Sequence, residues 1–157
     1  MIVVLQRVAR AAVRVDGREA ASIGKGLCLL ACAVDGDAEG DAAQLADKIA
    51  TLRVFEDAQG ATNLALAEVG GAALVVPQFT LAADWRKGRR PSFTAAAARA
   101  AAQLLLTVFA QRLAAQGVPV ASGVFGAQMA VELVNDGPFT LVLDSRVLRE
   151  RGPDARS

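Results

Sequence analysis

Residues 27–34 read Leu-Cys-Leu-Leu-Ala-Cys-Ala-Val, an unbroken apolar run. A run of this length is typical of a strand that is buried on both faces. Residues 72–76, Ala-Ala-Leu-Val-Val, form a second run of the same kind after Gly70-Gly71. The two runs therefore predict two strands that lie inside the protein.

The residues before the first run predict further strands. Residues 1–8 are apolar but include Gln6 and Arg7 and have no basic leader, so they indicate a strand and not a signal peptide. Apolar residues alternate through residues 11–15, and Asp16-Gly17 then offers a tight turn into residues 18–23. A hairpin is therefore expected over residues 11–23.

Two helices are expected between the strands. A short one begins at Asp41, an N-cap residue type, and carries its apolar residues on one face. These residues are Leu45, Ile49 and Leu52. The one long helix should run from about Thr94 to Gln116 and end at Gly117.

The C-terminal part returns to strand patterns. Met129, Val131 and Leu133 alternate with other residues and predict a half-buried strand that stops at residues 135–138, Asn-Asp-Gly-Pro, and resumes over 139–143. Residues 146–157 are charged and end in polar residues, and we expect a frayed tail there.

Length and element order together predict one domain, residues 1–145. At 157 residues with 54% hydrophobic content, the chain fits a single core. Strands dominate both ends, with one long and one short helix between them, which is typical of an α+β fold around a curved or barrel-like mixed sheet.

The absence of histidine narrows the possible chemistry. It excludes Ser-His-Asp and Cys-His catalysis and removes the commonest zinc ligand. Cys28 and Cys32 lack the spacing of zinc or redox pairs, so we expect two packing residues in a reducing cytoplasm. Acidic residues are scattered without ligand spacing, so neither a metal nor another cofactor is expected. No apolar run approaches the roughly 20 residues that span a bilayer, so no membrane contact is expected.

Five motifs in order carry a resemblance to a known family. They are Gln6-Arg7-Val8, Arg53-Val54-Phe55-Glu56-Asp57 with Asn63-Leu64, Pro77-Gln78-Phe79-Thr80-Leu81, Arg90-Pro91-Ser92-Phe93, and Asn135-Asp136-Gly137-Pro138-Phe139-Thr140. Together they resemble the D-aminoacyl-tRNA deacylase family over residues 1–143. The resemblance implies a homodimer that hydrolyses the ester bond between tRNA and a D-amino acid, and that also acts on glycyl-tRNA, including glycine mischarged on tRNA-Ala.

Two positions depart from the family pattern. Pro77 stands where the family usually has Ser, and Phe139 where it usually has Val. Pro77 has no backbone N–H, so any contact made there in relatives is lost. A related branch of deacylases also carries Pro before Gln78 but departs at the Phe, so Phe79 favours the D-specific branch.

Gln78, Phe79 and Thr80 are the expected catalytic residues. An aminoacyl ester is already activated, so positioning and oxyanion stabilisation by the N–H groups of Phe79 and Thr80 could suffice. The Thr80 hydroxyl either attacks or positions water, or only forms a local hydrogen bond; no neighbouring His or Lys activates it. The resemblance adds that the 2′-hydroxyl of the tRNA assists the attack of water.

Gly137-Pro138 carries the expected selectivity. From the residues alone this dipeptide is an ordinary turn. The resemblance implies a cis peptide that reaches across the dimer, accepts hydrogen bonds from the substrate α-ammonium group, and leaves no room for an L side chain. Arg7 either holds this turn or is a half-buried surface residue. Met129 either lines the adenine pocket or fills the core.

Binding of the tRNA 3′ end needs a local basic patch, because 17 Lys and Arg residues face 16 Asp and Glu. The dense basic run contains Arg86, Lys87, Arg89 and Arg90. It is either a solvated loop or a contact for tRNA phosphates.

The rival interpretations are a deacylase for other misacylated tRNAs, a tRNA-binding or dimeric scaffold protein without turnover, and a metal-dependent hydrolase.

Overall fold

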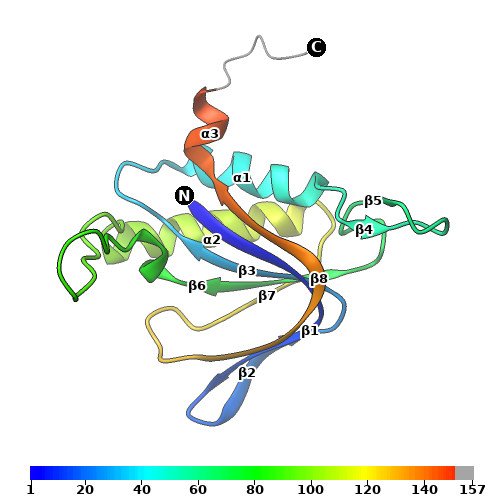
Figure 1. Ribbon diagram of the computed structural model, residues 1–157, viewed down its shortest axis with the longest axis horizontal. Coiled ribbons are helices and arrows are strands. Elements are labelled where there is room, and N and C mark those ends of the chain that lie inside the picture. Colours follow the sequence, from blue (N-terminus) through cyan, green and yellow to red (C-terminus); the bar gives the residue numbers. More distant parts are fainter. Residues whose placement is uncertain (151–157) are drawn as a thin grey trace.

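A curved six-stranded sheet forms the frame of the protein in the computed structural model, which describes residues 1–150 (Figure 1). Its strands follow the order β2-β1-β3-β6-β7, and β8 runs along the other edge of β1. The strands are β1 Ile2–Val15, β2 Arg18–Ile23, β3 Gly26–Cys32, β6 Ala72–Pro77, β7 Val120–Ser122 and β8 Ala130–Asp144. Parallel pairs β3–β6 and β6–β7 adjoin antiparallel ones, which confirms the expected α+β fold with a barrel-like mixed sheet.

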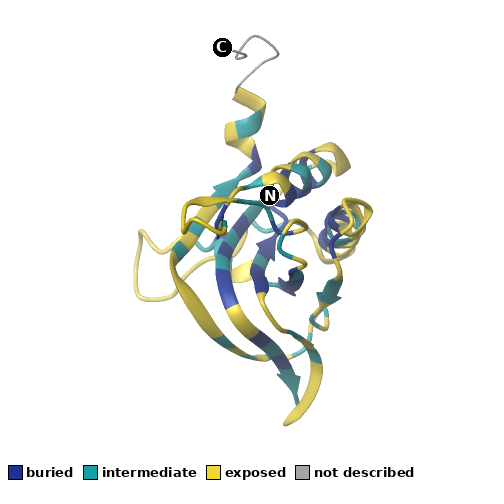
Figure 2. Ribbon diagram, turned by 90° about the vertical axis from the view of Figure 1, so that its right-hand side faces the viewer, coloured by how far each residue is buried: buried dark blue, intermediate teal, exposed yellow. Residues whose placement is uncertain are grey.

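The main core lies between this sheet and two helices. Helices α1, Glu39–Thr51, and α2, Arg99–Ala115, pack side by side on one face of the sheet (Figure 1). Leu29, Ile49 and Phe109 are fully buried there. Figure 2 shows buried residues gathered where helices and strands face each other. No helix within residues 1–150 is long and apolar enough to cross a membrane.

Irregular pairing in β1 creates a second, smaller core inside the curl of the sheet. Val3 and Leu5 face the main core, whereas Val8 and Val13 belong to the second. The pairing of β1 with β8 shifts register between Gln6 and Val8 and again after Val8. Such bulges bend a strand and increase its twist, so one long strand serves both cores.

One glycine permits the close approach of two central strands. Gly26 in β3 pairs with Ala72 in β6. A Cβ atom on Gly26 would lie 1.8 Å from the carbonyl oxygen of Ala72. Only a residue without a side chain fits at this point.

Several sequence predictions are confirmed at the level of elements. The hairpin over residues 11–23 and both buried strands are present. Cys28 and Cys32 are free and buried, as expected of packing residues. The very short strands β4, Phe55–Glu56, and β5, Thr62–Leu64, were not predicted; neither was β7.

The predicted helix boundaries were partly wrong. The long helix begins at Arg99 and not near Thr94, because residues 95–97 pair with residues 33–35 instead. Asp41 is not the N-cap of α1; Ala38 is, and the Asp41 carboxylate accepts the Ala38 N–H at 2.8 Å. Asp41 thus acts from the third helical position.

Two predictions at the C-terminal end also need correction. The last strand does not stop at residues 135–138, because β8 continues through them with shifted pairing to β1. Residues 146–150, expected to fray, belong to α3, Ser145–Glu150, where Arg149 pairs with Asp37 at 3.0 Å and also with Asp41. The remainder of the expected tail, residues 151–157, lies outside the described residues.

Candidate active site

A pocket of about 500 Å³ opens where β3 and β6 end. Parallel strands bring their C-terminal ends to one edge of the sheet, a common place for ligand sites. The pocket is closed by the segment after β6, the start of α2 and the segment before β8. Its lining consists of Ala31, Cys32, Ala33, Val76, Pro77, Gln78, Phe79, Ala96, Ala97, Arg99, Ala102, Leu106, Phe125, Gly126, Ala127, Gln128, Met129 and Val131.

The predicted catalytic residues lie at the start of η1, a 3-10 helix over Phe79–Ala82. Gln78 and Phe79 line the pocket, whereas Thr80 does not. The Gln78 amide donates to the Thr80 hydroxyl oxygen. Because Phe79 and Thr80 begin the helix, their N–H groups have no acceptor within it and remain available to a ligand.

Phe79 is unusually exposed for an aromatic residue. Its side chain is 59% exposed, and its ring meets that of Phe93 edge to face at 5.3 Å between centroids. Met129 lines the same pocket and also packs against the second core, so the structure fits both interpretations of its role. The pocket mouth is therefore flanked by apolar, polarisable side chains that suit a planar ring.

Cys32 lies in the pocket wall without the properties of a nucleophile. Burial raises the pKa of its thiol. The sulfur donates to the carbonyl oxygens of Ala33 at 3.3 Å and Phe79 at 3.5 Å. Because the thiolate is the reactive form, this protonated and engaged thiol is suited to packing. Within residues 1–150, no group of three or more His, Cys, Asp or Glu residues is placed to hold a metal ion.

Arg7 and the Gly-Pro segment (residues 135–138) form a separate constellation. Arg7 is only 4% exposed. Its guanidinium donates to the carbonyl oxygens of Asp136 and Gly137, both at 3.0 Å, and of Val54 at 2.6 Å. It also lies 4.7 Å from the centre of the Phe139 ring. Arg7 therefore holds the segment, and the alternative of a half-buried surface residue is wrong.

The Gly-Pro segment is exposed and does not line the pocket of its own chain. The Gly137-Pro138 peptide bond is cis. Asn135 steadies the segment by donating to the Arg7 carbonyl oxygen at 2.9 Å. Residues 135–138 are exposed, and neither Gly137, Pro138 nor Arg7 lines the pocket. Within one chain, the structure thus unites Gln78, Phe79 and Met129 but not the predicted selectivity residues.

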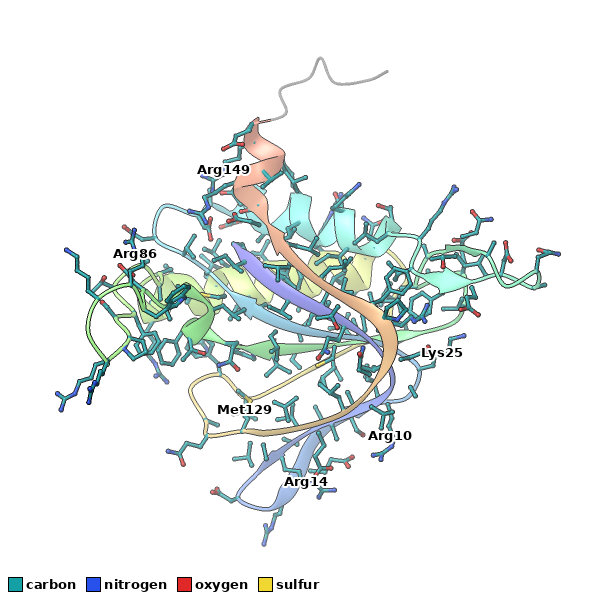
Figure 3. All side chains as sticks on the ribbon, viewed as in Figure 1. Arg10, Arg14, Lys25, Arg86, Met129 and Arg149 are labelled. Carbon is teal, nitrogen blue, oxygen red and sulfur yellow. The ribbon has the colours of Figure 1, made fainter. Side chains whose placement is uncertain are left out.

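The basic run forms an exposed loop between Asp84 and Ser92, which close it with two backbone hydrogen bonds of 2.7 and 2.9 Å. Arg86 pairs with Asp84 at 2.7 Å, and this partner lowers the pKa of Asp84 to about 2. Figure 3 shows Arg86 on the outer side of the molecule, in the loop that follows η1. Lys87, Arg89 and Arg90 are exposed and make no ion pair with residues 1–150.

Arg99 and Phe125 also line the pocket, and the sequence analysis did not identify either as a candidate site residue. Arg99 is the first residue of α2, and its guanidinium lies 5.4 Å from the centre of the Phe125 ring. The available signal was that Arg99 is the sole charged residue between Arg90 and Arg112. Phe125 carried no distinguishing pattern.

Comparison with known proteins agrees with the motifs. The family model described as D-Tyr-tRNA(Tyr) deacylase matches residues 4–144. A D-aminoacyl-tRNA deacylase of Chloroflexus aurantiacus is 56% identical over 149 residues, which cover 95% of this chain and 93% of the relative. One of Ruegeria pomeroyi is 54% identical over 144 residues, covering 92% of this chain and 99% of the relative.

A solved structure shares the fold closely. The structure described as "c-Myc DNA Unwinding Element Binding Protein" superimposes with a TM-score of 0.84 at 34% identity, covering 92% of this chain and 98% of that chain. The family expected from the five motifs is thereby confirmed: this chain belongs to the D-Tyr-tRNA(Tyr) deacylase family.

Proposed function

We propose that the protein hydrolyses the ester bond of D-aminoacyl-tRNA and releases the free D-amino acid and the tRNA. The observation that carries this proposal is the pocket at the ends of β3 and β6, which Gln78 and Phe79 line and beside which the N–H groups of Phe79 and Thr80 stand at the start of η1. The substrate class follows from family membership. Because aminoacyl-tRNA is made and used in the cytoplasm, we place the protein there.

The proposed hydrolysis depends on backbone N–H groups and on the tRNA itself more than on side chains of the protein. Water attacks the ester carbonyl carbon, and the negative charge that develops on the carbonyl oxygen is stabilised by the N–H groups of Phe79 and Thr80. The tetrahedral intermediate then releases the 3′-oxygen of the tRNA, which takes up a proton. The neighbouring 2′-hydroxyl assists the water, and the enzyme supplies position and electrostatic stabilisation.

Replacement of Thr80 by alanine should leave hydrolysis within about threefold of the wild-type rate, since the proposed mechanism uses its backbone N–H and not its hydroxyl. Deacylation of D-tyrosyl-tRNA under single-turnover conditions measures this. A loss on the order of 10³-fold or more would instead assign the hydroxyl to the reaction itself.

Selectivity is explained if a homodimer places the Gly-Pro segment of one chain at the pocket of the other. The segment is exposed, is fixed by Arg7, and does not line the pocket of its own chain. Gly137 already accepts one hydrogen bond from Arg7, so its second lone pair and the Pro138 carbonyl oxygen can receive the substrate α-ammonium group. An L side chain would then meet backbone atoms, whereas glycine would not.

The decisive experiment uses one tRNA charged separately with D-tyrosine, L-tyrosine or glycine, at enzyme far below substrate and with an EDTA control. We expect rapid loss of the D-tyrosyl and glycyl esters, including glycine on tRNA-Ala, and persistence of the L-tyrosyl ester. Sedimentation analysis should give a dimer. Loss of both tyrosyl esters would show that the protein does not discriminate between D- and L-amino acids. Loss of none would favour a binding protein, and inhibition by EDTA would revive a metal-dependent hydrolase.

Reversal of charge in the basic loop should weaken tRNA binding without changing the chemical step. In the variant Lys87→Glu/Arg89→Glu we expect the KM for aminoacyl-tRNA to rise about tenfold or more, with a shallower dependence of KM on salt. A matched control is Arg18→Glu/Lys48→Glu, which carries the same change in exposed residues of β2 and α1. Equal effects in both variants would show that the basic loop has no specific role in tRNA binding.

A further inference from the structure

Arg99 gives the pocket a single positive charge. Among residues 1–150, Arg99 is the only charged residue in the lining. The aminoacyl end of the proposed substrate carries two kinds of charge, a cationic α-ammonium group on the amino acid and an anionic phosphodiester on the nucleotide. A guanidinium group repels the first and attracts the second, so it distinguishes the two ends of the ligand.

Arg99 is exposed, and its guanidinium contacts neighbours that leave its donors free. It lies over the Phe125 ring, 5.4 Å from the centroid. A Cβ atom on Gly126 would lie 2.6 Å from its Nη2 atom, so a bare glycine makes room for it. No ion pair or hydrogen bond engages this side chain within the described part of the chain. Stacking on an aromatic ring orients a guanidinium group without using its N–H groups.

The start of α2 adds to the attraction for an anion. Its N-cap residue Ala98 makes no side-chain cap, and its first turn contains no acidic residue. Ala96 and Ala97, which lead into this helix, also line the pocket. The first N–H groups of a 17-residue helix therefore reinforce the charge of Arg99 on the same side of the pocket.

We propose that Arg99 binds the phosphodiester group on the 5′ side of the terminal adenosine of the tRNA and so positions the ester for hydrolysis. This inference rests on the proposed function. It also fixes the direction of the substrate: the nucleotide lies toward α2 and Phe125, and the amino acid points away from Arg99. The Phe125 ring stands next to the bound phosphate.

The test compares D-tyrosyl-tRNA with the 3′-O-D-tyrosyl ester of adenosine, which keeps the reacting ester and the terminal nucleoside but lacks the phosphodiester group and the rest of the tRNA. In Arg99→Gln, the KM for D-tyrosyl-tRNA should rise about 10- to 100-fold, with kcat within about threefold, since a charge-assisted contact is lost. The KM for the adenosine ester should not change. Arg99→Lys, which keeps the charge, should recover part of the loss.

Arg112→Gln is the matched control, because Arg112 lies on the same helix, is paired with Asp47 at 2.6 Å and does not line the pocket. It should leave both KM values unchanged. An equal rise with both substrates in Arg99→Gln, or a rise with neither, would overturn the assignment of Arg99 to the phosphate.

A binding measurement separates this inference from the proposed function. If the wild type cleaves neither ester, the proposed function fails, and calorimetry with adenosine 5′-monophosphate and adenosine still tests the phosphate contact. Wild type should bind the monophosphate at least about tenfold more tightly than adenosine, and Arg99→Gln should abolish the difference. Equal affinity of wild type for the two ligands would refute the contact.

Discussion

Replacement of Gly26 by alanine is expected to remove a large part of the stability of the protein. The new Cβ atom would lie 1.8 Å from the carbonyl oxygen, 2.8 Å from the carbonyl carbon and 2.9 Å from the nitrogen of Ala72. These are backbone atoms of the paired strand β6, so no side-chain rotation can relieve the overlap. The two strands must separate, and we expect a loss above about 4 kcal/mol from a total stability of about 5–15 kcal/mol.

Gly24→Ala, two residues earlier, is the matched control. A Cβ atom on Gly24 would have nothing within 4 Å. Its substitution should change the free energy of unfolding by no more than about 1 kcal/mol, because only backbone entropy is affected. Thermal unfolding followed by circular dichroism compares the two variants. Similar midpoints for both would show that β3 and β6 do not approach each other this closely in solution.

Replacement of Arg7 by lysine should damage both stability and activity. Arg7 supplies donors to the carbonyl oxygens of Val54, Asp136 and Gly137, and a lysine ammonium group cannot reach all three from one point. A buried carbonyl without a partner costs about 1–3 kcal/mol. We expect a loss of about 3 kcal/mol in the free energy of unfolding, which lowers the midpoint by about 6–12 °C.

The same variant should reduce the hydrolysis of D-tyrosyl-tRNA by about 100-fold, because small displacements of a positioning segment have effects of that order. Arg14→Lys serves as the comparison: Arg14 lies on the same strand, its side chain is 39% exposed, and within residues 1–150 it forms an ion pair with Glu132 alone, at 3.1 Å. Its change should stay within about 0.5 kcal/mol. If Arg7→Lys hydrolyses D-tyrosyl-tRNA at the wild-type rate at a temperature where the variant is folded, Arg7 has a structural role and does not position the Gly-Pro segment for the reaction.

Local patterns in the sequence predicted the elements whose formation is local. The apolar runs that became β3 and β6, and the turn at Asp16-Gly17, are of this kind. The start of α2 was missed because residues 95–97 are drawn into pairing with residues 33–35, a contact between distant parts of the chain. β4, β5 and β7 are two or three residues long and exist only through their partners.

The residues of the candidate site also fall into two groups, those that local sequence patterns identified and those placed by contacts between distant parts of the chain. Gln78, Phe79 and Met129 were identified because they lie in or beside recognisable motifs, and they do line the pocket. The burial of Arg7 depends on carbonyl groups from residues 54, 136 and 137, which no local pattern brings together. Arg99 reaches the pocket because α2 begins later than its apolar pattern suggests.

The pairing of β1 with β8 also governs how the protein can be synthesised. β1 leaves the ribosome well before β8, yet it pairs with β8 along its whole length, from Ile2 opposite Asp144 to Arg14 opposite Ala130. Its outer edge therefore stays unpaired until nearly the whole chain has emerged, for a time on the order of ten seconds at common rates of translation. During that interval, the nascent chain presents an open strand edge to other proteins, so chaperones that shield such edges should affect its yield more than its final stability.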